Sequence, residues 1–92
     1  MNKLDIVPSN RFKKDLKLAK RRGYDLSLLE ETVEKLARRE QLPQKNHDHD
    51  LAGDFIGFRE CHIQPDWLLV YRIVEEELIL FLSRTGTHSD LF

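Results

Sequence analysis

Hydrophobic and polar side chains alternate with a period of two from Phe55 to Ile63, in the second half of the chain. This period predicts a β-strand over residues 55–63, because successive side chains of a strand point to opposite faces of its sheet. Cys61 falls on the more apolar face, whereas Glu60 and His62 fall together on the other. A carboxylate and an imidazole are therefore expected to be neighbours on one side of this strand.

The pattern before this strand is mainly helical. Residues 3–7 form a short strand candidate that a proline ends, since proline cannot donate to a strand ladder. A helix is expected from Ser9 or Asn10 to Arg22, with Gly23 placed to end it. Its apolar residues recur at i, i+4 and i+7, so only a narrow stripe packs on the core: Phe12, Leu16 and Ala19.

A second helix follows, with Asp25 or Ser27 as its cap, and Ser27 with Glu30 matches a capping box. The spacing of its apolar residues predicts one buried face, made of Leu29, Val33, Leu36 and Ala37. The two helices are expected to form a hairpin. Residues 41–54 then read as a polar linker that contains two histidines and several aspartates.

Two further strands are predicted, over residues 67–74 and 78–84. Short turns at 64–66 and 75–77 join the three long strands, so these strands should form an antiparallel meander. The element order is βααβββ. The predicted fold is therefore α+β, a small antiparallel sheet packed against a two-helix hairpin, in a single domain over residues 1–92. The segment 85–92 reads as a short, mostly polar tail.

Composition narrows the class of protein. The hydrophobic fraction of 40% and the charged fraction of 34% are typical of a soluble globular protein. The sequence contains neither the roughly 18-residue apolar run of a membrane span nor a signal peptide, so we expect a cytoplasmic protein without a membrane partner. Cys61 is the single cysteine, which excludes an internal disulfide and an all-cysteine metal site and favours a buried thiol.

Charge is unevenly distributed although the formal net charge is only −1. Residues 11–22 are strongly basic, whereas residues 75–77 are acidic. Such a local positive surface can bind phosphates, and the alternative is a solvated helix face. The candidate phosphate-binding cations in this run are Lys13, Lys14, Lys17, Lys20 and Arg21.

Glu60 and His62 form the first candidate for chemistry. A carboxylate can orient an imidazole, and histidine is the side chain whose ordinary pKa lies closest to neutrality. The alternative is a pair of solvated polar residues on the open side of a strand. Residues 47–50, with the sequence H-D-H-D, offer a metal site by composition, but two histidines at i and i+2 in a linker are a weak signal, and we predict no metal or other cofactor.

Two separated motifs carry a family resemblance. Residues 57–72 read G-F-R-E-C-H-I-Q-P-D-W-L-L-V-Y-R, and residues 84–92 read R-T-G-T-H-S-D-L-F. A basic first helix with F-K-K-D-L-K-L-A and an H-x-L-x-G segment at 49–53 accompany them. With these motifs the sequence resembles the YafQ branch of the RelE/ParE toxin superfamily over nearly its whole length.

This resemblance implies the toxin of a bacterial type II toxin–antitoxin pair, an endoribonuclease that cuts messenger RNA in the ribosomal A site. It implies a cognate antitoxin, the ribosome and messenger RNA as partners. Two departures from the family pattern are a glutamate at position 60, where the pattern has aspartate, and a near-neutral charge. The matching catalytic and RNA-contacting positions are His49, Glu60, His62, Asp66, Trp67, Arg84, His88 and Phe92.

RNA can be cut without a metal because its 2′-hydroxyl attacks the adjacent phosphate. The protein must then supply a base, an acid and positive charge for the transition state. Histidines 49, 62 and 88 could supply the proton transfers, with Asp66 as a base or an orienting group, and Arg84 could hold the phosphate. Trp67 and Phe92 could stack on unpaired bases. His47 is a second candidate for the role of His49, although only His49 has the motif spacing.

Each of these residues also has a structural interpretation. Trp67 can be a core residue, Asp66 can serve only its turn, Arg84 can pair with a nearby carboxylate, and Phe92 can cover a sheet edge. Two other functions stay open: a ParE-like toxin without catalysis that inhibits a protein such as gyrase, and a module that binds a partner. The histidines favour the enzyme.

Overall fold

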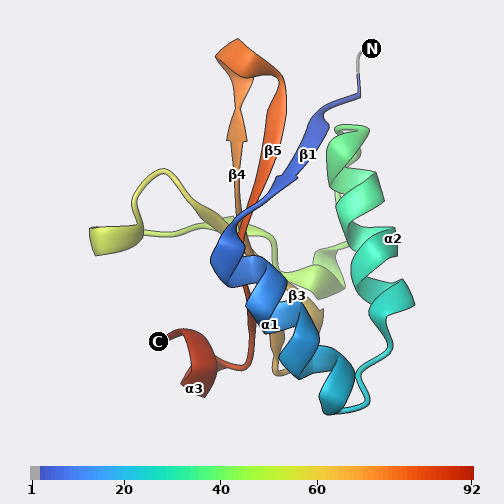
Figure 1. The fold of residues 1–92 in the computed structure, drawn as a ribbon. Coiled ribbons are helices and arrows are strands. Elements are labelled where there is room, and N and C mark those ends of the chain that lie inside the picture. The colour runs from blue at the N-terminus through green and yellow to red at the C-terminus, as the bar shows by residue number, and fades with distance from the viewer. Residues whose placement is uncertain (1–2) are drawn as a thin grey trace.

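The computed structural model describes residues 3–92 as one twisted sheet with helices packed against it (Figure 1). The strand order is β1-β5-β4-β3-β2. The strands are β1 Asp5–Pro8, β2 His49–Asp50, β3 Arg59–Gln64, β4 Trp67–Val74 and β5 Ile79–Gly86. The helices are α1 Asn10–Arg21, α2 Leu26–Ala37 and α3 His88–Leu91, and single 3-10 turns occur at η1 Gln44–Asn46, η2 Gly53–Phe55 and η3 Glu75–Glu77.

The predicted antiparallel meander is confirmed, since β3, β4 and β5 pair antiparallel in succession. The first strand, however, pairs parallel with β5, so the sheet is mixed. The hydrophobic pattern of so short a strand does not encode its partner or its direction. The α+β class and the order of the main elements agree with the prediction, and β2 adds a two-residue strand inside the expected linker.

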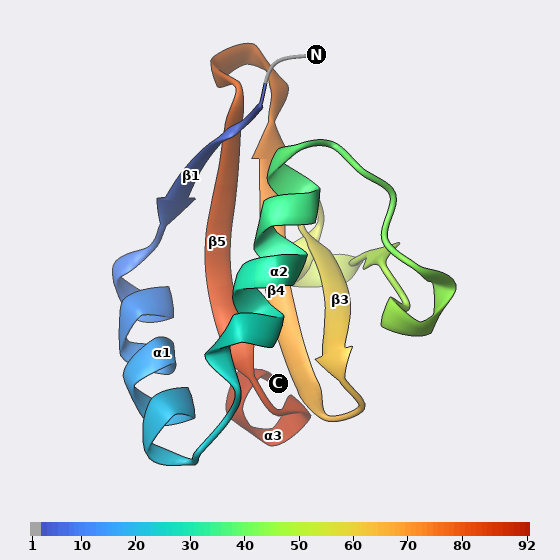
Figure 2. The same cartoon turned by 90° about the vertical axis from the view of Figure 1, so that its right-hand side faces the viewer.

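Both helix caps fall where the sequence allows them. The Ser9 hydroxyl accepts the Phe12 amide at 2.9 Å and caps α1. Asp25, rather than Ser27, caps α2, because its carboxylate accepts both the amide and the hydroxyl of Ser27. Helix α2 lies across one face of the sheet, and α1 continues from β1 alongside β5 (Figure 2).

The core between α2 and the sheet contains the predicted apolar face of α2 and the side chains of β4 that point toward it. Cys61 is fully buried there, and burial raises the pKa of its thiol to about 12. Trp67 is 1% exposed, and its indole N–H donates to the Thr85 hydroxyl at 2.9 Å. The expectation that Trp67 stacks on RNA bases is therefore wrong, and its core interpretation holds.

Several strand boundaries differ from the sequence prediction, and β1 runs from Asp5 to Pro8, so the proline lies within this strand at its pairing with β5 rather than after it. Strand β3 begins at Arg59 rather than at residue 55, because Phe55 belongs to η2 and Gly57 has a positive φ of 93° that breaks the extended chain. At the other end, β5 extends to Gly86 and the expected polar tail forms α3. Within residues 3–92 no helix is long and apolar enough to cross a membrane.

Replacing Trp67 by phenylalanine should lower the free energy of unfolding by about 1–3 kcal/mol, because it removes the bond to Thr85 and leaves a cavity in the core. Urea unfolding measures this change. The matched variant Phe92→Leu changes a residue that is 55% exposed, so it should leave stability nearly unchanged. An unaltered stability for Trp67→Phe would contradict the core role.

Candidate active site

A buried carboxylate lies at the centre of the candidate site. The side chain of Glu60 on β3 is only 6% exposed, and its Oε1 lies 3.6 Å from His62 Nε2 and 3.7 Å from His49 Nε2. The backbone explains this arrangement, because His49 and Glu60 are partners in the β2–β3 register and His62 follows Glu60 on the same face of β3. The alternative interpretation, in which Glu60 is a solvated residue on the open side of the strand, is therefore wrong.

His88 reaches the same place from the other end of the chain. Its ring lies 5.9 Å from the ring of His62, and ligand atoms of Glu60, His62 and His88 all lie within 4.8 Å of one another. Asp66, in the turn between β3 and β4, accepts the His88 amide at 3.2 Å and lies 3.2 Å from His88 Nδ1. The backbone bond from His88 is the main cause that lowers the pKa of Asp66.

The short helix α3 positions His88 by an anchored first turn. Thr87 and Asp90 form a capping box, in which each side chain accepts the backbone amide of the other residue. Arg22, just after α1, donates to Asp90 at 2.6 Å, and this bond holds the pKa of Asp90 well below its usual range. An added Cβ at Gly86 would meet the Asp90 carboxylate at 2.9 Å.

A network of charges holds the segment that carries His49. Arg59 binds Asp50 at 2.6 Å and Asp48 at 3.3 Å, the two residues on either side of His49. The hydroxyl of Tyr71 donates to Asp48 and accepts from Arg59 Nε at 3.3 Å. The sequence analysis did not predict this network. The two aspartates in H-D-H-D at residues 47–50 were a usable signal, because Asp50 pairs with Arg59 in the β2–β3 register.

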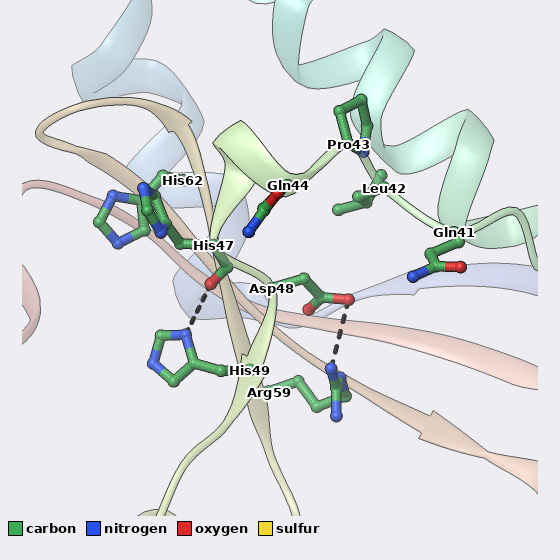
Figure 3. A pocket seen from close by; sticks show the side chains of 9 residues that line it. All are labelled: Gln41, Leu42, Pro43, Gln44, His47, Asp48, His49, Arg59 and His62. Atoms are coloured by element: carbon green, nitrogen blue, oxygen red, sulfur yellow. Dashed lines mark hydrogen bonds and ion pairs between the residues drawn. The ribbon is translucent and has the colours of Figure 1, made fainter.

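The orientation of His49 follows from one backbone contact. Its Nδ1 lies 2.6 Å from the His47 carbonyl oxygen, which can only accept, so Nδ1 carries the proton (Figure 3). Nε2, the nitrogen that faces Glu60, is then the one that takes up or releases a proton. The structure thus places the free ring nitrogen of His49 beside the Glu60 carboxylate.

His47 is closer to the site than its linker position suggested. Its ring lies 5.3 Å from that of His62 (Figure 3). The neighbouring Asn46 donates to the His62 carbonyl at 2.7 Å. An open cavity of about 980 Å³ lies beside these rings. Its lining residues are Gln41, Leu42, Pro43, Gln44, His47, Asp48, His49, Arg59 and His62.

Arg84 does not join the histidine cluster. Its Nε donates to Asp15 of α1 at 2.8 Å, and Asp15 also accepts the Thr85 amide at 3.1 Å. The structure therefore shows the alternative interpretation, a pair with a nearby carboxylate that ties α1 to β5. The predicted cations of α1 are all exposed and lie outside the cluster: Lys13, Lys14, Lys17, Lys20 and Arg21.

Three groups of the cluster offer ligand atoms that a metal ion could share. These are Glu60, His62 and His88, not the H-D-H-D run at 47–50. Imidazole nitrogen and carboxylate oxygen together suit zinc and copper. The same nitrogens would have to be unprotonated to bind a metal, so metal binding and proton transfer are competing uses of these side chains.

Residues 4–92 match the family model that is described as "Bacterial toxin of type II toxin-antitoxin system, YafQ". The chain belongs to the YafQ family. Its resemblance to this branch, read from two motifs, is confirmed. The mRNA interferase toxin YafQ of Escherichia coli strain K12 is 38% identical, over 96% of this chain and 95% of that protein.

Solved structures of YafQ relatives share the fold. A crystal structure of a metal-bound toxin from Helicobacter pylori is 49% identical with a TM-score of 0.92, and covers 97% of this chain and 99% of that one. YafQ in the E. coli DinJ-YafQ toxin-antitoxin complex is 37% identical with a TM-score of 0.88, and 98% of each chain is covered.

The variant Arg59→Met should loosen the His49 segment, because it removes both ion pairs while keeping most of the apolar stem. We expect the Leu51 amide, which donates to the Phe58 carbonyl at 2.9 Å, to exchange with solvent at least about tenfold faster. Hydrogen exchange followed by NMR measures this rate. Arg38→Met, just after α2, is the control, and equal exchange in both variants would contradict the role of Arg59.

Proposed function

We propose that this protein is an mRNA interferase, a ribosome-dependent endoribonuclease that cuts messenger RNA in the A site and so stops translation. The observation that carries the proposal is the convergence of His49, His62 and His88 around the buried Glu60, together with Asp66. Membership of the YafQ family and the printed activity of its E. coli relative support the same function.

The chemistry needs no metal. The 2′-hydroxyl of one ribose attacks the neighbouring phosphate, a base removes its proton, and an acid protonates the departing 5′-oxygen. His62 and His88 are the base and acid pair, because their rings are neighbours and open toward solvent, with side chains 21% and 58% exposed. The product of the first step is a 2′,3′-cyclic phosphate with a free 5′-hydroxyl.

The two carboxylates have separate parts in this mechanism. Asp66 accepts from His88 Nδ1 and fixes the ring, which leaves Nε2 for proton transfer. Glu60 Oε1 lies 3.7 Å from His49 Nε2, and in its protonated form His49 supplies positive charge to the phosphate in the transition state. Arg84 is paired with Asp15, so this mechanism gives it no direct contact with the phosphate.

The ribosome and the antitoxin are the proposed partners. The exposed cations of α1 give a surface for ribosomal RNA phosphates, a sequence-independent attraction that salt weakens. A cognate antitoxin would neutralise the toxin, as the E. coli complex of DinJ and YafQ suggests by analogy. We therefore propose that the protein acts in the bacterial cytoplasm, where both partners would be found.

Expression of the wild-type chain should arrest growth with translation stopped and messenger cut within codons. His62→Gln and His88→Gln should each lower cleavage about a hundredfold or more, the usual effect of losing a general acid or base. Primer extension on messenger from induced cells maps the cuts, and ribosome assays measure the rates.

The matched control is Glu76→Gln in the exposed turn η3, which should remain fully toxic. Melting temperature and antitoxin binding should be nearly unchanged in both histidine variants, because neither side chain belongs to the apolar core and His62→Gln keeps an N–H donor for Glu60. Intact messenger during a translation arrest by the wild type, or an early stop of replication, would overturn the nuclease proposal.

Cleavage should be insensitive to a chelator that removes zinc and copper but leaves the magnesium of the ribosome, such as TPEN. Added Zn²⁺ should inhibit cleavage, because Glu60, His62 and His88 would bind the ion and the two histidines could then no longer transfer protons. The ribosome assay with titrated Zn²⁺, with and without TPEN, measures both effects. Activity that TPEN abolishes and Zn²⁺ restores would contradict the metal-free mechanism.

A further inference from the structure

The open cavity of about 980 Å³ lies directly against the histidine cluster, and the proposed proton transfers make no use of it. Its volume is at the upper end of the roughly 300–1,000 Å³ that is typical of sites for small organic groups. His49 and His62 belong both to its wall and to the cluster, and the His47 ring, 5.3 Å from the His62 ring, extends the same wall. A group bound in this cavity would therefore lie next to the phosphate on which the histidines act.

Apart from these histidines, the charged side chains of the wall are paired with each other. Each side-chain nitrogen of Arg59 has a partner, since Nε donates to Tyr71 at 3.3 Å, Nη1 donates to Asp50 at 2.6 Å and Nη2 lies 3.3 Å from Asp48. Asp48 in turn accepts from the Tyr71 hydroxyl. A paired arginine and aspartate present little net charge to the cavity. This part of the wall therefore suits a neutral group rather than a second phosphate.

The rest of the wall combines an apolar patch with a side-chain amide. Leu42, which is 7% exposed, and Pro43 supply the apolar patch. The amide of Gln44 extends from η1 toward the side of the cavity that carries His47 and Asp48 (Figure 3). An amide offers a hydrogen-bond donor and an acceptor at once. A nucleobase fits these surroundings, because it is neutral and flat and carries its donors and acceptors along one edge.

We propose that this cavity holds the base of a nucleotide next to the phosphate to be cut, and that Gln44 reads the edge of that base. This inference rests on the proposed nuclease function and names a part of its substrate. A side-chain amide makes two hydrogen bonds with a base edge whose donor and acceptor match it, and a base that does not match leaves a polar group unpaired. Gln44 is thus a residue that determines specificity, while the histidines carry out the chemistry.

The position of Gln44 makes the proposal testable. Its side chain is exposed, and its backbone carbonyl accepts the His47 amide at 3.0 Å, so the η1 turn is closed by the backbone rather than by the side chain. Gln44→Leu therefore removes the amide and keeps a side chain of similar size. Gln44→Glu keeps the acceptor and removes the donor.

The test measures kcat/KM on ribosomes programmed with messengers that carry each of the four bases at each position flanking the cut. Wild type should prefer one base at one flanking position. Gln44→Leu should reduce the ratio between the best and the worst base there by about 5- to 150-fold, the range expected for one bidentate contact. Gln44→Glu should shift the preference toward a base that offers donors, such as cytosine.

Gln64→Leu is the matched control. Gln64 is also exposed, and it lines a second, smaller cavity of about 520 Å³ that shares His47 and His62 with the first. This variant should keep the wild-type order of bases, and the melting temperatures of all variants should agree. An unchanged order of bases in Gln44→Leu or in Gln44→Glu would overturn the proposal. A loss of preference in Gln64→Leu alone would also overturn it, because the base would then belong to the smaller cavity.

A messenger with an abasic nucleotide at the selected position separates a base site from a phosphate site. Wild type should cut this messenger about 5- to 150-fold more slowly than the best base, and Gln44→Leu should show a smaller loss. Equal cleavage of the abasic and the intact messenger by wild type would show that the cavity holds no base. A wild type that cuts no RNA at all would instead overturn the proposed function, and only that result would remove both proposals together.

Discussion

The burial of the Glu60 carboxylate is the constraint on which the rest of the site depends. A charge that is removed from water needs partners that compensate for the lost hydration. Glu60 finds them in His49 and His62, which lie within 3.7 Å of it. Strand pairing fixes both contacts, since β2 carries one histidine opposite the carboxylate and β3 carries the other on the same face. The sheet thus brings two histidines together beside one buried carboxylate.

Regular structure was predictable from sequence because it depends on local periods. The alternation on β3 placed Glu60 beside His62 correctly, and apolar spacing identified both main helices and the meander. The parallel partner of β1 was not predictable, since a strand of four residues carries no information about its direction. Helix α3 was missed because its capping box lies in a segment too short to show a helical period.

Individual side chains were harder to assign than elements. Trp67 and Arg84 stand in motif positions, yet the indole is in the core and the guanidinium is bound by Asp15. Both outcomes depend on contacts between residues far apart in the chain, which a local pattern cannot reveal. The contact between the rings of Phe55 and Phe92 could not be predicted for the same reason, since Phe92 follows the last helix. Motif membership therefore located the region of the site more reliably than it located the groups that touch a ligand.

The close approach of Gly86 to Asp90 suggests the variant Gly86→Ala as a way to inactivate this toxin without changing a residue of the histidine cluster. A methyl group at position 86 would push against a carboxylate 2.9 Å away, which caps α3 and binds Arg22. Loss of that cap would release the turn that carries His88 without altering an ionisable side chain or the core. Such a copy would keep the surfaces of α1 and the sheet, so it could be expressed to capture binding partners without the activity of the intact site.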